Sequence, residues 1–218
     1  MFSKDLSKFQ EIEHSYWRYY CELEQEMLQT RKYVDFGKDN FKSYSLEYLK
    51  LYQAVCGEID SFLKLLAKEL DPSFNEKNTS IQKCWFEVQS WYQTASIKTV
   101  SFCKEYVLEP WSGYVVTRAY SKNKRLIYSG IAPEWWKAYT DIKHARALLG
   151  DDGSPNFFKA NLKNVSNAFA ALYVLEKNAM NEFGDRKSKA EVPLSLLFDK
   201  RFRSYVDENG FSLVVGEM

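Results

Sequence analysis

The stretch "YSLEYLKLYQAVCGEIDSFLKLLAKELDP", residues 44–72, carries the pattern that decides the fold class. Its apolar side chains recur at intervals of three and four, at Tyr44, Tyr48, Leu51, Val55, Ile59, Phe62 and Leu66. Because an α-helix turns once in 3.6 residues, this spacing predicts a helix over residues 41–70 with one buried face. Asp71 and Pro72 predict its end, since the residue before a proline disfavours the helical conformation.

The same periodicity recurs along most of the chain. Pro133 fits the first turn of one such helix, where its missing N–H would have no partner in any case. Further helices are predicted over residues 5–33, 79–107 (as one long or two shorter helices), 134–148 and 156–179. The predicted fold class is therefore mainly α, a helical bundle.

Two segments depart from the helical pattern. In "YVVTRAYSKNKRLIYSG", residues 114–130, two β-prone runs flank a polar tetrapeptide, which predicts a small irregular or β-hairpin insertion around 113–131. The C-terminal "FSLVVGEM", residues 211–218, is expected to be a strand or a tail docked on the core. We expect one helical domain over 1–218, in which 180–218 form a less regular C-terminal extension.

Composition limits the class of protein. Hydrophobic residues make up 45% and aromatic residues 17%, which is ample for a packed core and argues against wholesale disorder. No apolar run approaches the roughly 20 residues that cross a bilayer, and the charged N-terminus lacks a signal peptide's apolar segment. These features predict a soluble cytoplasmic protein without membrane partners. The balance of 30 basic and 29 acidic side chains leaves room only for a local basic patch.

Metal and cofactor chemistry find little support in the sequence. The four cysteines are scattered without a C-x-x-C pair, and the two histidines, His14 and His144, lie 130 residues apart. We therefore expect no metal site and free thiols in a reducing compartment. Neither a glycine-rich phosphate loop nor a nucleophile elbow occurs, so no cofactor is expected.

The strongest candidate for chemistry is "WWKAYTDIKHARALLG", residues 135–150, in which Lys143 and Arg146 flank His144. The charge of a histidine changes near neutral pH, and the two neighbouring cations would favour its neutral, basic form and could hold a phosphate. The imidazole could then move a proton while Arg146 stabilises charge on phosphorus. The alternative is a surface histidine among ordinary helix charges, because His144 lies off the centre of the apolar face.

Polar residues on two other helices could belong to such a site. Glu58 borders the buried stripe of its helix, where a carboxylate is costly unless it is paired. It is expected either to form a structural ion pair with another helix or to orient a catalytic base. Asn161, Asn164 and Asn167 recur every third residue, and they predict a polar seam, an edge near a site, or simply exposed asparagines.

These segments also resemble a known group of proteins. "YSLEYLKLYQAVCGEID", "WWKAYTDIKHAR" and "FFKANLKNVSNAFAALYVL" resemble uncharacterised bacterial and phage-associated helical proteins that look like members of the HEPN superfamily. The resemblance covers about 41–70 and 133–178. It implies a helical bundle that dimerises, and many HEPN proteins are metal-independent ribonucleases of toxin–antitoxin or phage-defence systems.

The resemblance also implies roles for individual residues. HEPN active sites place an Arg a few residues before a His, and His144 matches that His. Here Lys137 stands seven positions before His144 and Arg146 follows it, so one of these two would supply the cation. The residues expected to bind phosphate or RNA, or to position the catalytic pair, are Lys143, Lys137, Glu58, Asn164 and Tyr139.

Two hypotheses about function follow. In the first, the protein is a HEPN-like, metal-independent endoribonuclease effector of a phage-defence or toxin–antitoxin type system, with His144 and Arg146 as catalytic residues. It would form a homodimer and meet RNA and an antitoxin or other partner protein. In the second, it is a non-catalytic helical module that binds a partner protein or RNA, because several HEPN members are inactive.

Overall fold

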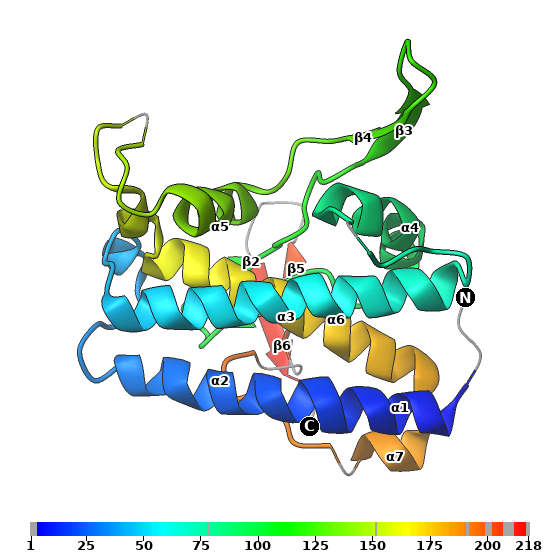
Figure 1. Ribbon diagram of the computed structural model, residues 1–218. Helices are drawn as coiled ribbons and strands as arrows, with labels where there is room; N and C mark the ends of the chain where they lie inside the picture. The colour runs from blue at the N-terminus through cyan, green and yellow to red at the C-terminus, as the bar shows by residue number, and fades with distance from the viewer. Residues whose placement is uncertain are drawn as a thin grey trace.

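The protein is mainly α-helical (Figure 1). The computed structural model describes residues 4–77, 79–150, 152–190 and 192–198, and only the backbone of 186, 190, 202–206 and 212–216. The α-helices are α1 (Leu6–Ile12), α2 (Arg18–Thr30), α3 (Leu46–Leu70), α4 (Ile81–Thr94), α5 (Glu134–Ala145), α6 (Leu162–Phe183) and α7 (Arg186–Ala190). A π-helical turn (Glu13–Trp17) joins α1 to α2, and 3-10 turns lie at Lys38–Asn40 and Asn156–Lys159.

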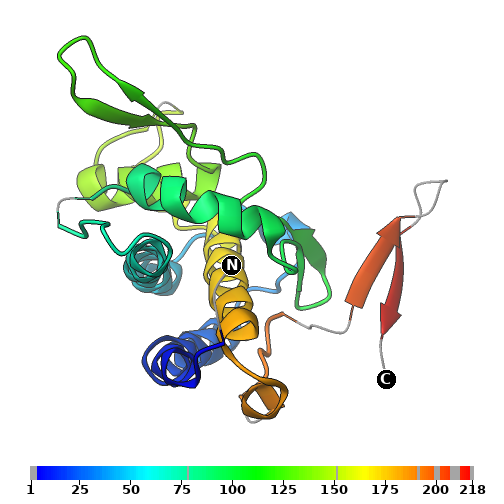
Figure 2. The same cartoon turned by 90° about the vertical axis from the view of Figure 1, so that its right-hand side faces the viewer.

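The strands form antiparallel pairs. β1 (Val100–Phe102) pairs with β2 (Tyr106–Leu108), and β5 (Phe202–Val206) pairs with β6 (Ser212–Gly216). β3 (Thr117–Tyr120) and β4 (Leu126–Ser129) form the hairpin that the sequence predicts within residues 114–130. This hairpin extends away from the helical body in two perpendicular views (Figures 1 and 2).

Helix α6 is the centre of the fold. Every residue from Ala168 to Met180 is buried, as expected for a helix that other elements surround. It contacts α1, α2, α3, α5 and β1, and Figure 2 shows it running through the middle of the molecule. The alanines at 168, 170 and 171 have no bulk beyond Cβ, so neighbouring helices can approach closely.

Tryptophans attach α5 to this core. The Trp135 indole N–H donates to the carbonyl of Pro110 at 2.8 Å, and the Trp111 indole N–H donates to Ala171 at 3.2 Å. The Tyr52 hydroxyl donates to the Trp135 carbonyl. Buried aromatic residues whose polar atoms find partners combine a large apolar area with a fixed orientation. The tryptophan pair Trp135 and Trp136 therefore anchors α5 through packing.

The predicted helix over 79–107 is wrong beyond Thr94. After α4 the chain forms β1 and β2, joined by residues 103–105, in which Cys103 and Lys104 have φ values of +47° and +63°, in the left-handed region. A residue distant in sequence supports this change, because the Asn178 side chain accepts from the Ile97 N–H at 3.0 Å and donates to its carbonyl at 2.6 Å. Asn178 thus satisfies backbone groups that a continuing helix would have paired internally.

The helix predicted over 156–179 begins later and ends later. Residues 156–159 form a 3-10 turn, and α6 begins at Leu162 because the Asn161 side chain caps it by accepting from the Asn164 N–H at 3.1 Å. It continues to Phe183, four residues into the expected C-terminal extension. Of the C-terminal "FSLVVGEM", residues 212–216 form β6, and the other three lie outside the described residues.

No helix in the described part of the chain is long and apolar enough to span a membrane.

Candidate functional site

The candidate site lies at the C-terminal end of α5. Buried Trp135, Trp136, Tyr139 and Ile142 face the core. This orientation leaves Lys137, Lys143, His144 and Arg146 exposed. We call Lys143, His144 and Arg146 the basic turn, because they occupy a single turn at the end of the helix, on the left of Figure 1.

The backbone of the basic turn is held firmly. The Asn156 side chain donates to the Ala145 carbonyl at 3.0 Å, and the Phe157 N–H donates to the Arg146 carbonyl at 3.1 Å. Carbonyls at a helix end have no partner within the helix, so these two bonds satisfy groups that would otherwise need water. The exposed side chains therefore project from a rigid support.

The charges of the basic turn have no ion-pair partner within the described part of the chain. The acidic residue one turn earlier, Asp141, is paired with Lys159 at 2.6 Å. Lys143 lies over the ring of Tyr139, with its Nζ 5.9 Å from the centroid. The basic turn is thus free to bind an anion.

Glu58 does not meet the cation or donor that its position predicts. No ion pair or hydrogen bond of the described residues satisfies its carboxylate, and burial raises its pKa. The charge of Glu58 raises the pKa of Glu176, a fully buried acid of α6. The expectation of a structural ion pair at Glu58 is therefore wrong, because α6 presents another acid there instead of a cation.

The asparagines act locally at the start of α6. Asn161 caps the helix, Asn164 donates to the Lys159 carbonyl at 2.8 Å, and Asn167 donates to the Lys163 carbonyl at 2.8 Å. These bonds shape the turn that leads into α6. Among the bonds of the described residues, none joins Asn164 to the basic turn, so its expected positioning role stays a prediction.

Tyr139 is part of the packing under α5. Its ring lies against Tyr52, with centroids 5.9 Å apart, and against Trp136 at 5.2 Å. Burial raises the pKa of the Tyr139 hydroxyl to about 12, so this group stays protonated at neutral pH. Because its ring packs against the core, Tyr139 helps to hold the helix that carries the basic turn. Lys137 lies on the exposed side of α5, one and a half turns or more before the basic turn.

Sequence reasoning missed a buried carboxylate on α2. Glu24 accepts hydrogen bonds from the Tyr20 hydroxyl at 2.9 Å and from the N–H groups of Leu196 and Leu197 at 2.6 and 3.0 Å. The Ser195 hydroxyl also donates to it. Glu24 thereby docks residues 195–197 against α2. The available signal was its position between Tyr20 and Met27, on the buried face of its helix.

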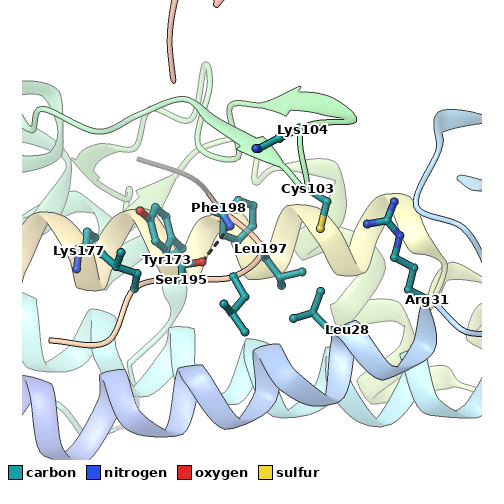
Figure 3. A pocket seen from close by; sticks show the side chains of 11 residues that line it. Leu28, Arg31, Cys103, Lys104, Tyr173, Lys177, Ser195, Leu197 and Phe198 are labelled. Atoms are coloured by element: carbon teal, nitrogen blue, oxygen red, sulfur yellow. Dashed lines mark hydrogen bonds between the residues drawn. The ribbon is translucent and has the colours of Figure 1, made fainter. Parts of the chain in front are cut away.

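A cavity of about 520 Å³ lies beside this docked segment, between α2 and α6 (Figure 3). Figure 3 shows Leu28 of α2 and Arg31, which follows that helix, facing Ser195, Leu197 and Phe198 across it. Burial raises the pKa of the Cys103 thiol in its wall to about 11, so this thiol is unreactive at neutral pH. Because the docked segment forms one wall, the cavity is a consequence of the docking by Glu24.

The cysteines and histidines do not gather into a metal site. Cys21, Cys56, Cys84 and Cys103 are free thiols. Among the residues whose placement is described, no group of three or more His, Cys, Asp or Glu side chains is arranged to hold a metal ion. His14 is exposed on the N-terminal helical segment.

Comparison with known proteins returns no relative. No family model, curated protein or solved structure matches this chain. What the basic turn binds must therefore be inferred from its own side chains and their surroundings.

Proposed function

We propose that the protein binds RNA and that the basic turn contacts the phosphate backbone. The observation that carries this proposal is the exposure of Lys143, His144 and Arg146 on one rigid turn, without an acidic partner in the described chain. Phosphate contacts by Lys and Arg supply most of the sequence-independent affinity for nucleic acids. Exposed side chains on a helix end suit an extended polyanion better than a small molecule, which binds in a concave pocket.

The resemblance of residues 133–178 to HEPN proteins is what selects RNA among polyanions. Many HEPN proteins act on RNA, and in this chain the residues that carry the resemblance include the whole basic turn. The neutral overall charge of the chain does not oppose binding, because a local patch is sufficient for a few phosphate contacts.

Replacing both permanent cations of the basic turn tests RNA binding. K143Q/R146Q is expected to weaken binding and to reduce the slope of log K against log salt by about 1.4, because each lost contact with a single strand removes about 0.7. Fluorescence anisotropy of a labelled single-stranded RNA, measured over a range of salt concentrations, gives both values.

Lys50→Gln is the matched control for this experiment. Lys50 is an exposed helical lysine, but it is already paired with Glu26 at 2.6 Å and Glu47 at 3.0 Å. Its replacement should leave the salt slope unchanged. If K143Q/R146Q binds RNA with the wild-type slope, the basic turn is not a phosphate site.

RNA cleavage is a second candidate function, and one observation favours it. Leu148 and Leu149, which lie two and three residues after the basic turn, are 66% and 67% exposed. A second copy that covered these leucines would enclose His144 and exclude water. The imidazole could then take the proton of an attacking 2′-hydroxyl while Arg146 stabilises the charge on phosphorus, and the 5′-oxygen would leave. The homodimer, the antitoxin partner and the defence-system role belong to this candidate.

His144→Ala tests cleavage separately from binding. It is expected to lower the rate of RNA cleavage by at least about 100-fold, the range for a lost general acid or base, while leaving RNA affinity nearly unchanged. Cleavage of labelled RNA in the presence of a chelator gives the rate. His14→Ala, at the other histidine, should cleave as the wild type does. Full cleavage by His144→Ala would rule out this mechanism.

A further inference from the structure

The β3–β4 hairpin is an arm with almost no packing of its own. We call residues 117–129 the hairpin arm. Its strands pair from Thr117 with Ser129 to Tyr120 with Leu126, and nearly all of its residues are exposed. Figures 1 and 2 show it rising clear of the helices. A two-stranded hairpin is only marginally stable alone, so an arm of this kind calls for a reason.

The base of the arm is fixed to α4. Gln89 both donates to the Val116 carbonyl and accepts from its N–H, each at 2.9 Å. Arg118 lies 4.7 Å from the centroid of the Phe86 ring, and Tyr128 contacts the same ring edge-on at 5.5 Å. These contacts set the direction of the arm and occupy Arg118.

The end of the arm carries a concentrated positive charge. The arm holds four of the chain's 30 basic side chains and none of its 29 acidic ones, so the rest of the chain is net acidic. Lys122, Lys124 and Arg125, which we call the tip, are exposed and form no ion pair with any described residue. The positive potential is therefore localised at the tip, whereas the rest of the chain carries a net negative charge.

The turn places a lysine where glycine is favoured. The Ser121 N–H donates to the Arg125 carbonyl at 2.8 Å, and the Lys124 N–H donates to the Ser121 carbonyl at 2.9 Å. This closes a tight loop in which Lys124 has a φ of +56°. A side chain with a Cβ costs conformational free energy there, and glycine does not. Lysine at this position lowers the stability of the turn relative to glycine. Its presence therefore points to a role for its charge in binding and not in folding.

An uncovered aromatic ring accompanies the charges. Side chains alternate between the faces of a strand, so Tyr120 lies on the same face as Arg118. Arg118 covers Phe86, but Tyr120 is further along the arm, and 77% of it is exposed. An exposed aromatic ring beside a basic patch is a platform on which an unpaired base can stack.

We propose that the hairpin arm binds single-stranded nucleic acid, with the tip on successive phosphates and Tyr120 stacked on a base. This deepens the proposed RNA binding and rests on it, since it adds a second contact area to that of the basic turn. The ring selects a single strand, because a duplex offers phosphates but keeps its base faces stacked within the helix.

Lys124→Gly separates binding from folding. It removes one phosphate contact and relieves the left-handed backbone, so thermal stability should be equal or higher while the salt slope falls by about 0.7. Replacing the whole tip, as K122Q/K124G/R125Q, should lower the slope by about 2 and the affinity by roughly tenfold or more. The probe is a fluorescein-labelled single-stranded RNA of about 12 nucleotides, within the site size of common single-strand binding folds.

Tyr120 has its own pair of variants. Tyr120→Ala should weaken RNA binding by about fivefold or more, the lower end of the range for a lost stacking contact, and Tyr120→Phe should bind as the wild type does. Equal affinity for the DNA strand of the same sequence would show that the arm reads phosphates and bases alone. Preference for RNA would add a contact to the 2′-hydroxyl. Both results support a single-strand site.

The outcomes distinguish this proposal from the proposed function. If the tip variants bind RNA with wild-type affinity and slope while K143Q/R146Q is impaired, the arm is not a binding site and the basic turn is. If the tip variants bind RNA more weakly and K143Q/R146Q binds as the wild type does, the arm is a binding site and the basic turn is not. Tighter binding to duplex than to single strand overturns the arm's assignment. The assignment is also overturned if the protein does not bind RNA but binds vesicles of phosphatidylserine and phosphatidylcholine in a way that the tip variants abolish.

Discussion

Replacing Glu24 with alanine is expected to lower the free energy of unfolding by at least about 3 kcal/mol, because donors that now face a buried carboxylate lose their acceptor. Four groups donate to this carboxylate: the Tyr20 and Ser195 hydroxyls and the N–H groups of Leu196 and Leu197. In a chain of this size, such a loss corresponds to a fall of roughly 6 °C or more in the melting temperature.

The loss should be local before it is global. Glu24 accepts from the N–H groups of Leu196 and Leu197. Among the described residues, the only other backbone hydrogen bond of 195–197 runs from the Cys103 N–H to the Leu197 carbonyl at 2.7 Å, so Glu24→Ala should also expose the segment to protease cleavage below the melting temperature. Glu22→Ala is the matched control, since Glu22 is an exposed acid on the same helix. A melting temperature and a cleavage pattern equal to those of Glu22→Ala would show that the carboxylate does not hold this segment.

Glu176→Gln is expected to stabilise the protein, and the gain should increase with pH. Glu176 is fully buried, and neither of its carboxylate oxygens has a hydrogen-bond partner among the described residues. Burial raises its pKa well above the ordinary value, the charge of Glu58 raises it further, and Lys177 lowers it. The neutral form is therefore the one that the folded state favours.

The sign of the pH dependence follows from this raised pKa. A carboxyl group whose pKa is higher in the folded state stabilises the fold fully below its unfolded value, near 4.5. That contribution is lost as the pH rises toward the folded value, by at most about 1.4 kcal/mol per pH unit. Glutamine cannot ionise, so the variant avoids the loss.

Melting temperatures measured from pH 4 to pH 8, values which span about the ordinary pKa of Glu and neutral pH, test this expectation. The difference between Glu176→Gln and the wild type should widen steadily as the pH rises. Glu182→Gln, at a less buried acid of the same helix, should show no such widening. A constant difference across this range would mean that Glu176 is ionised in the folded protein throughout, or has a partner that neutralises it.

Most of the helices could be predicted because the apolar spacing that favours a helix is a property of the local sequence. Apolar spacing alone predicts α3, and the structure places its stripe from Tyr48 to Leu66 in the core. The helix begins at Leu46 and not at residue 41, so Tyr44, which the spacing predicts on the same stripe, lies before it and is 45% exposed. The hairpin insertion was also predictable, since two β-prone runs flank a polar tetrapeptide. The end of α4 was not, because the strand pair that follows depends on Asn178, a residue about 80 positions away.

Buried carboxylates mark the limit of reasoning from one sequence. The position of Glu58 on the apolar stripe correctly indicates an unfavourable environment, but it does not reveal which residue lies opposite. Glu24 satisfies the same rule on α2 and has four donors, whereas Glu58 has as its neighbour another acid, Glu176, whose pKa its charge raises. Helical periodicity predicts which face is buried, and only the packing of the helices decides what meets it.

The candidate site was predictable to the same extent. His144 was expected to lie off the apolar face of its helix, and it is exposed beside Lys143 and Arg146. The rigid support from Asn156 depends on a loop conformation that residue spacing does not encode. Asp141 is likewise unavailable to the basic turn because it pairs with Lys159, across 18 residues, and no other described acid pairs with the turn.

Binding of single-stranded RNA over a range of salt concentrations tests the central claim most directly. Two cationic contacts at the basic turn, from Lys143 and Arg146, and three at the hairpin tip predict saturable binding whose log K falls with log salt at a slope of about −3.5 between roughly 50 and 200 mM. The triple tip variant combined with K143Q/R146Q should remove most of that slope. Absence of binding by the wild-type protein at the lowest salt concentration, or binding that does not change with salt, would contradict the account.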